Sequence, residues 1–208
     1  MRPVSQQFTP VAPDDLTRLV ADRIVQLEGR AIVLVDGADA AEPLAFAERI
    51  ADTLRATGRE CGVVSLHDYV HPASLRLEYG HTDEMSYRTI WFDVDAVRRE
   101  VVDSFRADGR WLPALWDERR DRSARRTVVT SGPEATLIVA GPMLLGQDLH
   151  SDVSVRLHLT SGALQRKTPT EEQWTLAAIA EYERDSATEP DITVRWDHPD
   201  RPAMRFRD

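Results

Sequence analysis

The sequence has 208 residues, of which 42% are hydrophobic and 29% charged, enough to form the core of one compact domain. Its formal net charge of −9 opposes non-specific binding to nucleic acid, which depends on neutralising phosphates. No apolar run approaches the roughly 20 residues that span a bilayer. Residues 1–13 lack a signal-peptide pattern, and a single cysteine excludes an intrachain disulfide. These features predict one cytoplasmic domain, 1–208, that binds neither nucleic acid nor a membrane.

The first half of the chain alternates strands and helices. Residues 1–13 are polar and contain proline, which predicts a loose N-terminal arm. Apolar spacing then predicts a helix over 14–27, a buried strand over 31–35, a helix over 44–57 and a second buried strand over 62–66. The two strands should be parallel, with a right-handed crossover between them.

The second half continues this alternation. A long polar loop over 72–89 leads to a helix whose apolar face runs to about residue 105 and which Asp108-Gly109 ends. The mixed-sign run over 118–126 predicts a solvated turn rather than a phosphate clamp. Further strands are predicted over 126–130, 135–140, 153–159 and 192–196, with a broken helix over 162–184 and a polar tail over 197–208. The pattern predicts a three-layer α/β/α sandwich with a mainly parallel sheet.

The loop between the first strand and its helix has the spacing of a phosphate-binding loop, G-x-x-x-x-G-K-[ST]. Gly37 occupies the first glycine position, but Glu42, Pro43 and Leu44 replace the second glycine, the lysine and the hydroxyl residue. Glu42 adds an anion, Pro43 lacks a backbone donor and Leu44 cannot bind a metal. Lys167 is the only lysine in the sequence. Spacing alone leaves an ordinary strand–helix turn as an equal alternative.

Six segments, taken in order, resemble the uridine kinase-like branch of the P-loop nucleoside kinases. The likeness covers about residues 30–200 and implies a P-loop NTPase-like fold. Its segments are VDGADAAEPLAFAERIA (35–51), LHDYVHP (66–72), WFDVDAVRR (91–99), ALWD (114–117), TLIVAGPMLL (136–145) and TVRWDHPDRP (193–202). No single segment is specific, but their common order is hard to obtain by chance.

The resemblance also implies roles for individual residues. In such kinases an Asp after the second strand takes the proton from the substrate, and an acidic residue ends the third strand near the metal. Here His67 occupies the first position, with Asp68 beside it, and Ala140 occupies the second. His67 and Asp68 are therefore only weak catalytic candidates. The ligand contacts that the resemblance implies fall on Gly37, Asp39, Tyr69, Phe92, Asp93, Trp116, Asp117 and Arg166.

Other interpretations apply to several of these residues. His67, His71 and His81 with Asp68 are unlike a metal site, because they do not share a helix face. Asp93 is placed to cap its helix. No metal site is therefore predicted.

We hypothesise a degenerate uridine kinase-like protein, a non-catalytic pseudokinase that binds a nucleoside-like small molecule or a protein partner and needs no cofactor. One alternative is an active nucleoside or small-molecule kinase that holds Mg-ATP through Arg166, Lys167 or the arginines of 118–126. Another is a structural or oligomerising α/β domain with no ligand. The sequence does not indicate the oligomeric state.

Overall fold

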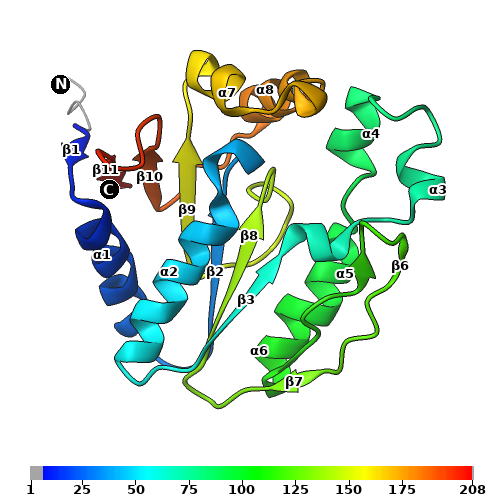
Figure 1. The fold of residues 1–208 in the computed structure, drawn as a ribbon. Helices are drawn as coiled ribbons and strands as arrows, with labels where there is room; N and C mark the ends of the chain where they lie inside the picture. The colour runs from blue at the N-terminus through cyan, green and yellow to red at the C-terminus, as the bar shows by residue number, and fades with distance from the viewer. Residues whose placement is uncertain (1–6, 208) are drawn as a thin grey trace.

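The computed structural model describes residues 7–207, and a seven-stranded sheet crosses the middle of the molecule (Figure 1). Its strands are β1 (Thr9–Pro10), β2 (Ala31–Asp36), β3 (Cys61–Ser65), β8 (Thr136–Gly141), β9 (Val153–His158), β10 (Ile192–Arg195) and β11 (Ala203–Phe206). They lie in the order β1-β11-β10-β9-β2-β8-β3. The five strands from β10 to β3 pair in parallel, and β11 and β1 add antiparallel to one edge. The predicted mainly parallel sheet is confirmed.

The remaining elements are short, apart from three helices. The helices are α1 (Pro13–Val25), α2 (Pro43–Ala56), α3 (Ala73–Arg76), α4 (Glu84–Thr89), α5 (Val94–Val97), α6 (Ser104–Asp108), α7 (Ser161–Lys167) and α8 (Thr175–Asp185). The turns η1 (Asp39–Ala41), η2 (Leu66–Tyr69) and η4 (Thr170–Glu172) are 3-10 helical, and the π-helical η3 (Arg98–Asp103) joins α5 to α6. Two small sheets pair β4 (Arg110–Trp111) with β7 (Val129–Thr130) and β5 (Trp116–Asp117) with β6 (Arg122–Ser123).

The central strand β2 shows how the three layers form. Successive side chains of a strand point to opposite faces of the sheet. Val33 packs in a core cluster with Phe46 of α2, whereas its neighbour Ile32 packs in a second cluster with Phe105 of α6. Every residue of β2 is buried, because helices cover both faces of the sheet. This burial explains why the strand is apolar at every position before Asp36.

The terminal segments correct two predictions. Residues 9–10 of the predicted arm form β1, and residues 203–206 of the predicted tail form β11. These two strands pair with each other, and β11 also pairs with β10. Backbone hydrogen bonds to the edge of the sheet hold these two segments as strands. Such bonds do not depend on side-chain pattern, so a short sequence gives little sign of them. Residues 1–6 and Asp208 lie outside the described residues.

The predicted parallel relation of the first two core strands also holds, with one addition. β2 and β3 do not pair directly, because β8 lies between them and pairs in parallel with both. The prediction that Asp108-Gly109 ends the following helix is confirmed, because α6 ends at Asp108 and Gly109 adopts a φ of +80°. Among residues 7–207, no helix has the length and apolar character needed to cross a membrane.

Gly141, the last residue of β8, offers a test of this packing. A Cβ at this position would lie 2.4 Å from the Cβ of Leu66 in η2, so Gly141→Ala should destabilise the fold by about 1–3 kcal/mol. Gly162→Ala is the matched control, because there the nearest atom is the mobile end of Arg166 at 3.4 Å. In the helical context of α7, this control should be stabilising by about 0.5–1 kcal/mol. Urea unfolding measures both changes, and a wild-type midpoint for Gly141→Ala would contradict the packing argument.

Candidate functional site

The segments that form the candidate site follow the carboxyl ends of three neighbouring strands. Residues 37–42 follow β2, η2 follows β3, and residues 142–147 follow β8. Because these strands pair in parallel, their carboxyl ends lie at the same end of the sheet, and the segments that follow them meet there. Open parallel sheets bind their ligands at the carboxyl ends of their strands.

The loop after β2 folds into the 3-10 turn η1. The N–H of Ala41 donates to the carbonyl of Ala38 at 2.7 Å, and the N–H of Glu42 donates to that of Asp39 at 2.9 Å. Glu42 has a left-handed φ of 53°, and Pro43 begins α2 without an N–H to offer. Of the backbone groups that lead into α2, the N–H groups of Ala41 and Glu42 are thus used within the turn, and Pro43 has none.

Beside this loop, Asp36 and Arg156 form a buried ion pair. The Nε of Arg156 lies 3.0 Å from Oδ2 of Asp36, and the N–H of Leu144 donates to Oδ1 at 2.8 Å. Burial raises the pKa of Asp36, and the charge of Arg156 opposes that rise. The adjoining cavity has a volume of about 10 Å³, which is about the minimum for one water molecule.

His67 connects the loop to a distant hairpin. Its Nδ1 lies 2.8 Å from a carboxylate oxygen of Glu118, and its Nε2 lies 3.0 Å from one of Asp39. Glu118 also accepts hydrogen bonds from the guanidinium of Arg76 and the indole of Trp91, both at 3.1 Å. His67 and Glu118 thereby link η2 and the loop after β2 to the β5–β6 hairpin.

The protonation state of His67 follows from these contacts. Burial lowers the pKa of His67, but its hydrogen bonds to Asp39 and Glu118 outweigh this effect and raise it to about 10. The imidazole is therefore protonated at neutral pH and donates from both nitrogens. A protonated imidazole cannot accept a substrate proton, so His67 does not serve as a general base there.

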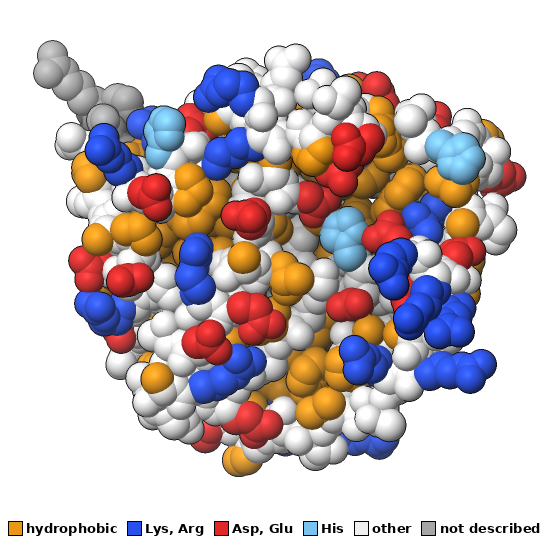
Figure 2. Space-filling model, in the orientation of Figure 1, with side chains coloured by type: hydrophobic (Ala, Val, Ile, Leu, Met, Phe, Trp, Pro, Cys, Tyr) orange, Lys and Arg blue, Asp and Glu red, His pale blue; other side chains and the backbone are white. Residues whose placement is uncertain are grey.

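The charged run 118–126 divides into two parts, which corrects the prediction of a wholly solvated turn. Glu118 turns inward to His67 and Arg76, as described above. The arginines behave as predicted: Figure 2 shows basic side chains gathered on the right of this face, where Figure 1 places β6. The exposed arginines of the run are Arg119, Arg120, Arg122, Arg125 and Arg126.

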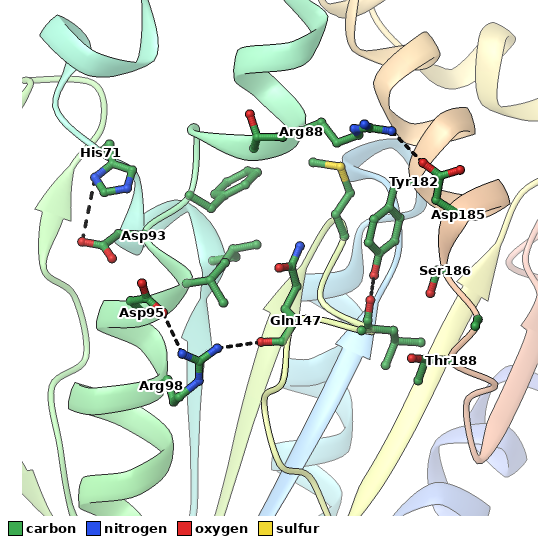
Figure 3. A pocket seen from close by; sticks show the side chains of 18 residues that line it. His71, Arg88, Asp93, Asp95, Arg98, Gln147, Tyr182, Asp185, Ser186 and Thr188 are labelled. Atoms are coloured by element: carbon green, nitrogen blue, oxygen red, sulfur yellow. Dashed lines mark hydrogen bonds and ion pairs between the residues drawn. The ribbon is translucent and has the colours of Figure 1, made fainter.

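A large pocket of about 760 Å³ lies between α4, α5, the segment after β8 and the end of α8 (Figure 3). Phe92 and Asp93 line it, together with His71. Asp93 accepts a hydrogen bond from the N–H of Ala96 at 2.9 Å, so it caps α5, and its second oxygen lies 3.9 Å from His71. Basic side chains in this pocket are already paired: Arg88 with Asp185 and Glu181, and Arg98 with Asp95.

A smaller pocket of about 320 Å³ lies against the loop after β2. Asp39 and His67 line it, together with aromatic side chains from α4 and the segments near α8. The Phe92 ring lies between the two pockets. It lines the large pocket, and its centroid lies 5.3 Å, in an edge-on arrangement, from that of His67, which lines the small pocket.

The structure places the predicted site residues unevenly. Asp39 and His67 meet in the small pocket, and Phe92 and Asp93 meet in the large one. Gly37 lines neither pocket but the cavity of about 10 Å³ beside Asp36, and a Cβ on Gly37 would lie 3.1 Å from Leu157.

The other predicted residues lie elsewhere. Tyr69 is fully buried, and its hydroxyl donates to the carbonyl of Leu112, so it acts as a core residue. Trp116 donates to Asp121, and Asp117 accepts from the N–H of Arg120, so both stabilise the β5–β6 hairpin. Asp68 and Arg166 line neither of the two pockets, and Arg166 is exposed on α7.

Sequence reasoning missed several residues of the site. Arg156 follows an ordinary strand pattern, and Tyr87 and Trp174 lie in segments that have no motif. Of the missed residues, only Glu118 had a signal in the sequence, because it directly follows ALWD (114–117), one of the segments that resemble the kinase family. Among residues 7–207, no group of three or more His, Cys, Asp or Glu side chains is arranged to hold a metal ion.

Comparison with known proteins identifies the fold. A possible uridine kinase from Bacillus stearothermophilus is 16% identical, with a TM-score of 0.64 over 84% of this chain and 96% of that one. A protein from Silicibacter sp. TM1040, provisionally assigned as a fructose transport system kinase, is 21% identical, with a TM-score of 0.70 over 88% of this chain and 98% of that one. The chain has a P-loop kinase-like fold. No protein-family model and no curated protein matches its sequence.

The His67 bridge predicts a pH-dependent contribution to the stability of this P-loop kinase-like fold. A folded-state pKa raised from 6.5 to about 10 gives stabilisation that is complete below 6.5 and is lost as the pH rises toward 10. The difference in unfolding free energy between wild type and His67→Gln should therefore be largest near pH 6.5 and shrink toward pH 10. Denaturant unfolding across this range measures it. The exposed His81→Gln variant is the control, and a His67→Gln difference independent of pH would contradict the charged bridge.

Proposed function

We propose that this protein is a non-catalytic relative of the uridine kinase-like P-loop kinases that binds a nucleoside-like small molecule in its large pocket. The observation that carries the proposal is the state of the loop after β2. Its Ala41 and Glu42 N–H groups are used in η1, Pro43 has none, and neither a lysine nor a hydroxyl residue stands at the start of α2.

Mg-ATP does not fit the residues present at this loop. A phosphate loop supplies backbone donors, a lysine and a hydroxyl that binds Mg²⁺. Here Leu44 replaces the hydroxyl residue, and the carboxylate of Asp36 is occupied by Arg156 and by the N–H of Leu144. Lys167, the one lysine of the sequence, donates to the carbonyl of Trp196.

The expected effect on catalysis is large. Phosphoryl transfer depends on positioning and on neutralising the charge of the phosphates. A single electrostatic group in such a site contributes on the order of 3–4 kcal/mol to lowering the barrier. Several are replaced here at once, at Glu42, Pro43, Leu44, His67 and Ala140. Even with strong non-additivity, ATP-dependent turnover should be very low.

Support for ligand binding comes from the other side of the site. The large pocket, at about 760 Å³, is within the size range of small-molecule sites. It combines the Phe92 ring with the Asp93 carboxylate and His71, a set that offers stacking, hydrogen-bond acceptors and a donor. A nucleoside presents an aromatic base and sugar hydroxyls that match these groups.

Isothermal titration calorimetry with a panel of nucleosides tests the binding half of the proposal. We expect a nucleoside to bind wild type and to bind Asp93→Asn about tenfold more weakly, because an amide accepts a weaker hydrogen bond than a carboxylate. Asparagine still caps α5, so the variant should fold. Asp103→Asn on η3, exposed and outside the pocket, is the matched control. Binding of Mg-ATP with turnover would favour an active kinase. If no nucleoside binds, the proposal of a nucleoside-like ligand is contradicted.

Repair of the loop tests its proposed ancestry. Glu42→Gly, Pro43→Lys and Leu44→Thr together should create measurable ATP affinity, because they restore the cation, the hydroxyl and a glycine at a left-handed position. Calorimetry with ATP and Mg²⁺ measures the gain. The control carries Glu42→Gly alone, which should not bind ATP but should unfold at higher temperature, since left-handed backbone costs a non-glycine residue about 1–2 kcal/mol. A folded triple variant without ATP affinity would contradict the ancestry.

A further inference from the structure

The small pocket differs in chemistry from both the large pocket and a phosphate site. Its cavity of about 320 Å³ is bounded by the loop after β2, η2, α4, the β5–β6 hairpin and the segment around η4 and α8. Its wall combines three carboxylates with three aromatic rings: Asp39, Glu118 and Glu172, and Tyr87, Trp91 and Trp174.

The charges in this pocket do not balance. Of the described residues that line it, His67 is the one cation against three carboxylates. Glu118 is satisfied by His67 and by Arg76 behind it. Asp39 gives one oxygen to His67, and its other oxygen accepts a hydrogen bond from the neutral Tyr87 hydroxyl at 3.4 Å.

Glu172 is the least satisfied of the three carboxylates. It is exposed in η4, and it forms no ion pair with any side chain of residues 7–207. The second oxygen of Asp39, which has no cationic partner, and the carboxylate of Glu172 therefore leave negative charge in a pocket lined by three aromatic rings.

The aromatic rings are arranged to present their faces in different directions. Tyr87, Trp91 and Trp174 contact one another with centroids 5.4–5.5 Å apart and interplanar angles of 52–76°, so they do not stack in parallel. One of these rings already binds a cation, because the Arg76 guanidinium lies 4.9 Å from the centroid of Trp91. Ring faces carry negative potential and attract cations.

We propose that this pocket binds a small organic cation, carried as an ammonium group, between the aromatic rings and the carboxylates of Asp39 and Glu172. An anionic ligand would meet like charge from both carboxylates. A neutral apolar ligand would remove water from them without giving them a partner, which is costly. An ammonium group satisfies both the ring faces and the carboxylates. The site is separate from the proposed nucleoside pocket, and its occupant does not depend on that proposal.

Choline and its neutral isostere 3,3-dimethylbutan-1-ol give a direct test on the full-length protein. The two molecules have nearly the same shape, so a difference between them reports the charge. By isothermal titration calorimetry, choline should bind with a dissociation constant of about 1 mM or tighter, and at least about tenfold tighter than the isostere. Agmatine, a primary amine with a guanidinium, is a second cationic probe of different shape.

Two variants locate the site. Glu172→Gln should weaken choline binding about fivefold to tenfold, because it removes the Coulombic attraction of the carboxylate for the quaternary ammonium, and the neighbouring exposed Glu171→Gln, which does not line the pocket, should leave it unchanged. Trp174→Leu should also weaken binding, and its thermal unfolding confirms that it folds. Equal binding of the isostere, equal effects of the two glutamine variants, or no binding of either cation would each overturn the proposal. Because nucleosides are titrated separately, failure of one pocket leaves the result for the other intact.

Discussion

The buried ion pair of Asp36 and Arg156 is the interaction on which the centre of the molecule depends. Asp36 ends β2, the middle one of the five parallel strands, and Arg156 extends from the neighbouring β9, while Leu144 donates to the same carboxylate from the segment after β8. Removing one partner of a buried pair leaves an uncompensated charge, at a cost of about 3–5 kcal/mol. The pair therefore links three segments at the carboxyl end of the parallel strands, where the site lies.

A second feature of this end of the sheet is that three of its cations are paired with the protein's own carboxylates. His67 is shared by Asp39 and Glu118, Arg76 is held by Glu118, and Arg88 is held by Asp185. A triphosphate needs cations that are free to neutralise it. This end of the sheet instead leaves a surplus of negative charge in its small pocket, which favours a cationic occupant there. The proposed loss of phosphoryl transfer and the proposed gain of cation binding thus share one electrostatic cause.

Much of the fold could be predicted because its signals are local. Residues 31–35 and 135–140 are continuous apolar runs of strand length, and the helix from residue 44 has regular apolar spacing. The short edge strands β1 and β11 could not be predicted, since their order depends on pairing and not on side-chain pattern. Of the site, Asp39, His67, Phe92 and Asp93 were found because they lie in or beside segments that resemble a family. Glu118 was misjudged, because a charged run gives no sign that one member turns inward.

The sequence by itself determined the buried strands, the glycine and proline positions, and the absence of a lysine and a hydroxyl from the loop at Pro43 and Leu44. These properties belong to single residues or to short runs, so no partner is needed to recognise them. Only the tertiary structure decided which charges meet. His67 joins residues 28 and 51 positions away, and Asp36 joins Arg156 across 120 positions. The physical reason is that these contacts depend on strand order and on the path of the β5–β6 hairpin, which no local preference encodes.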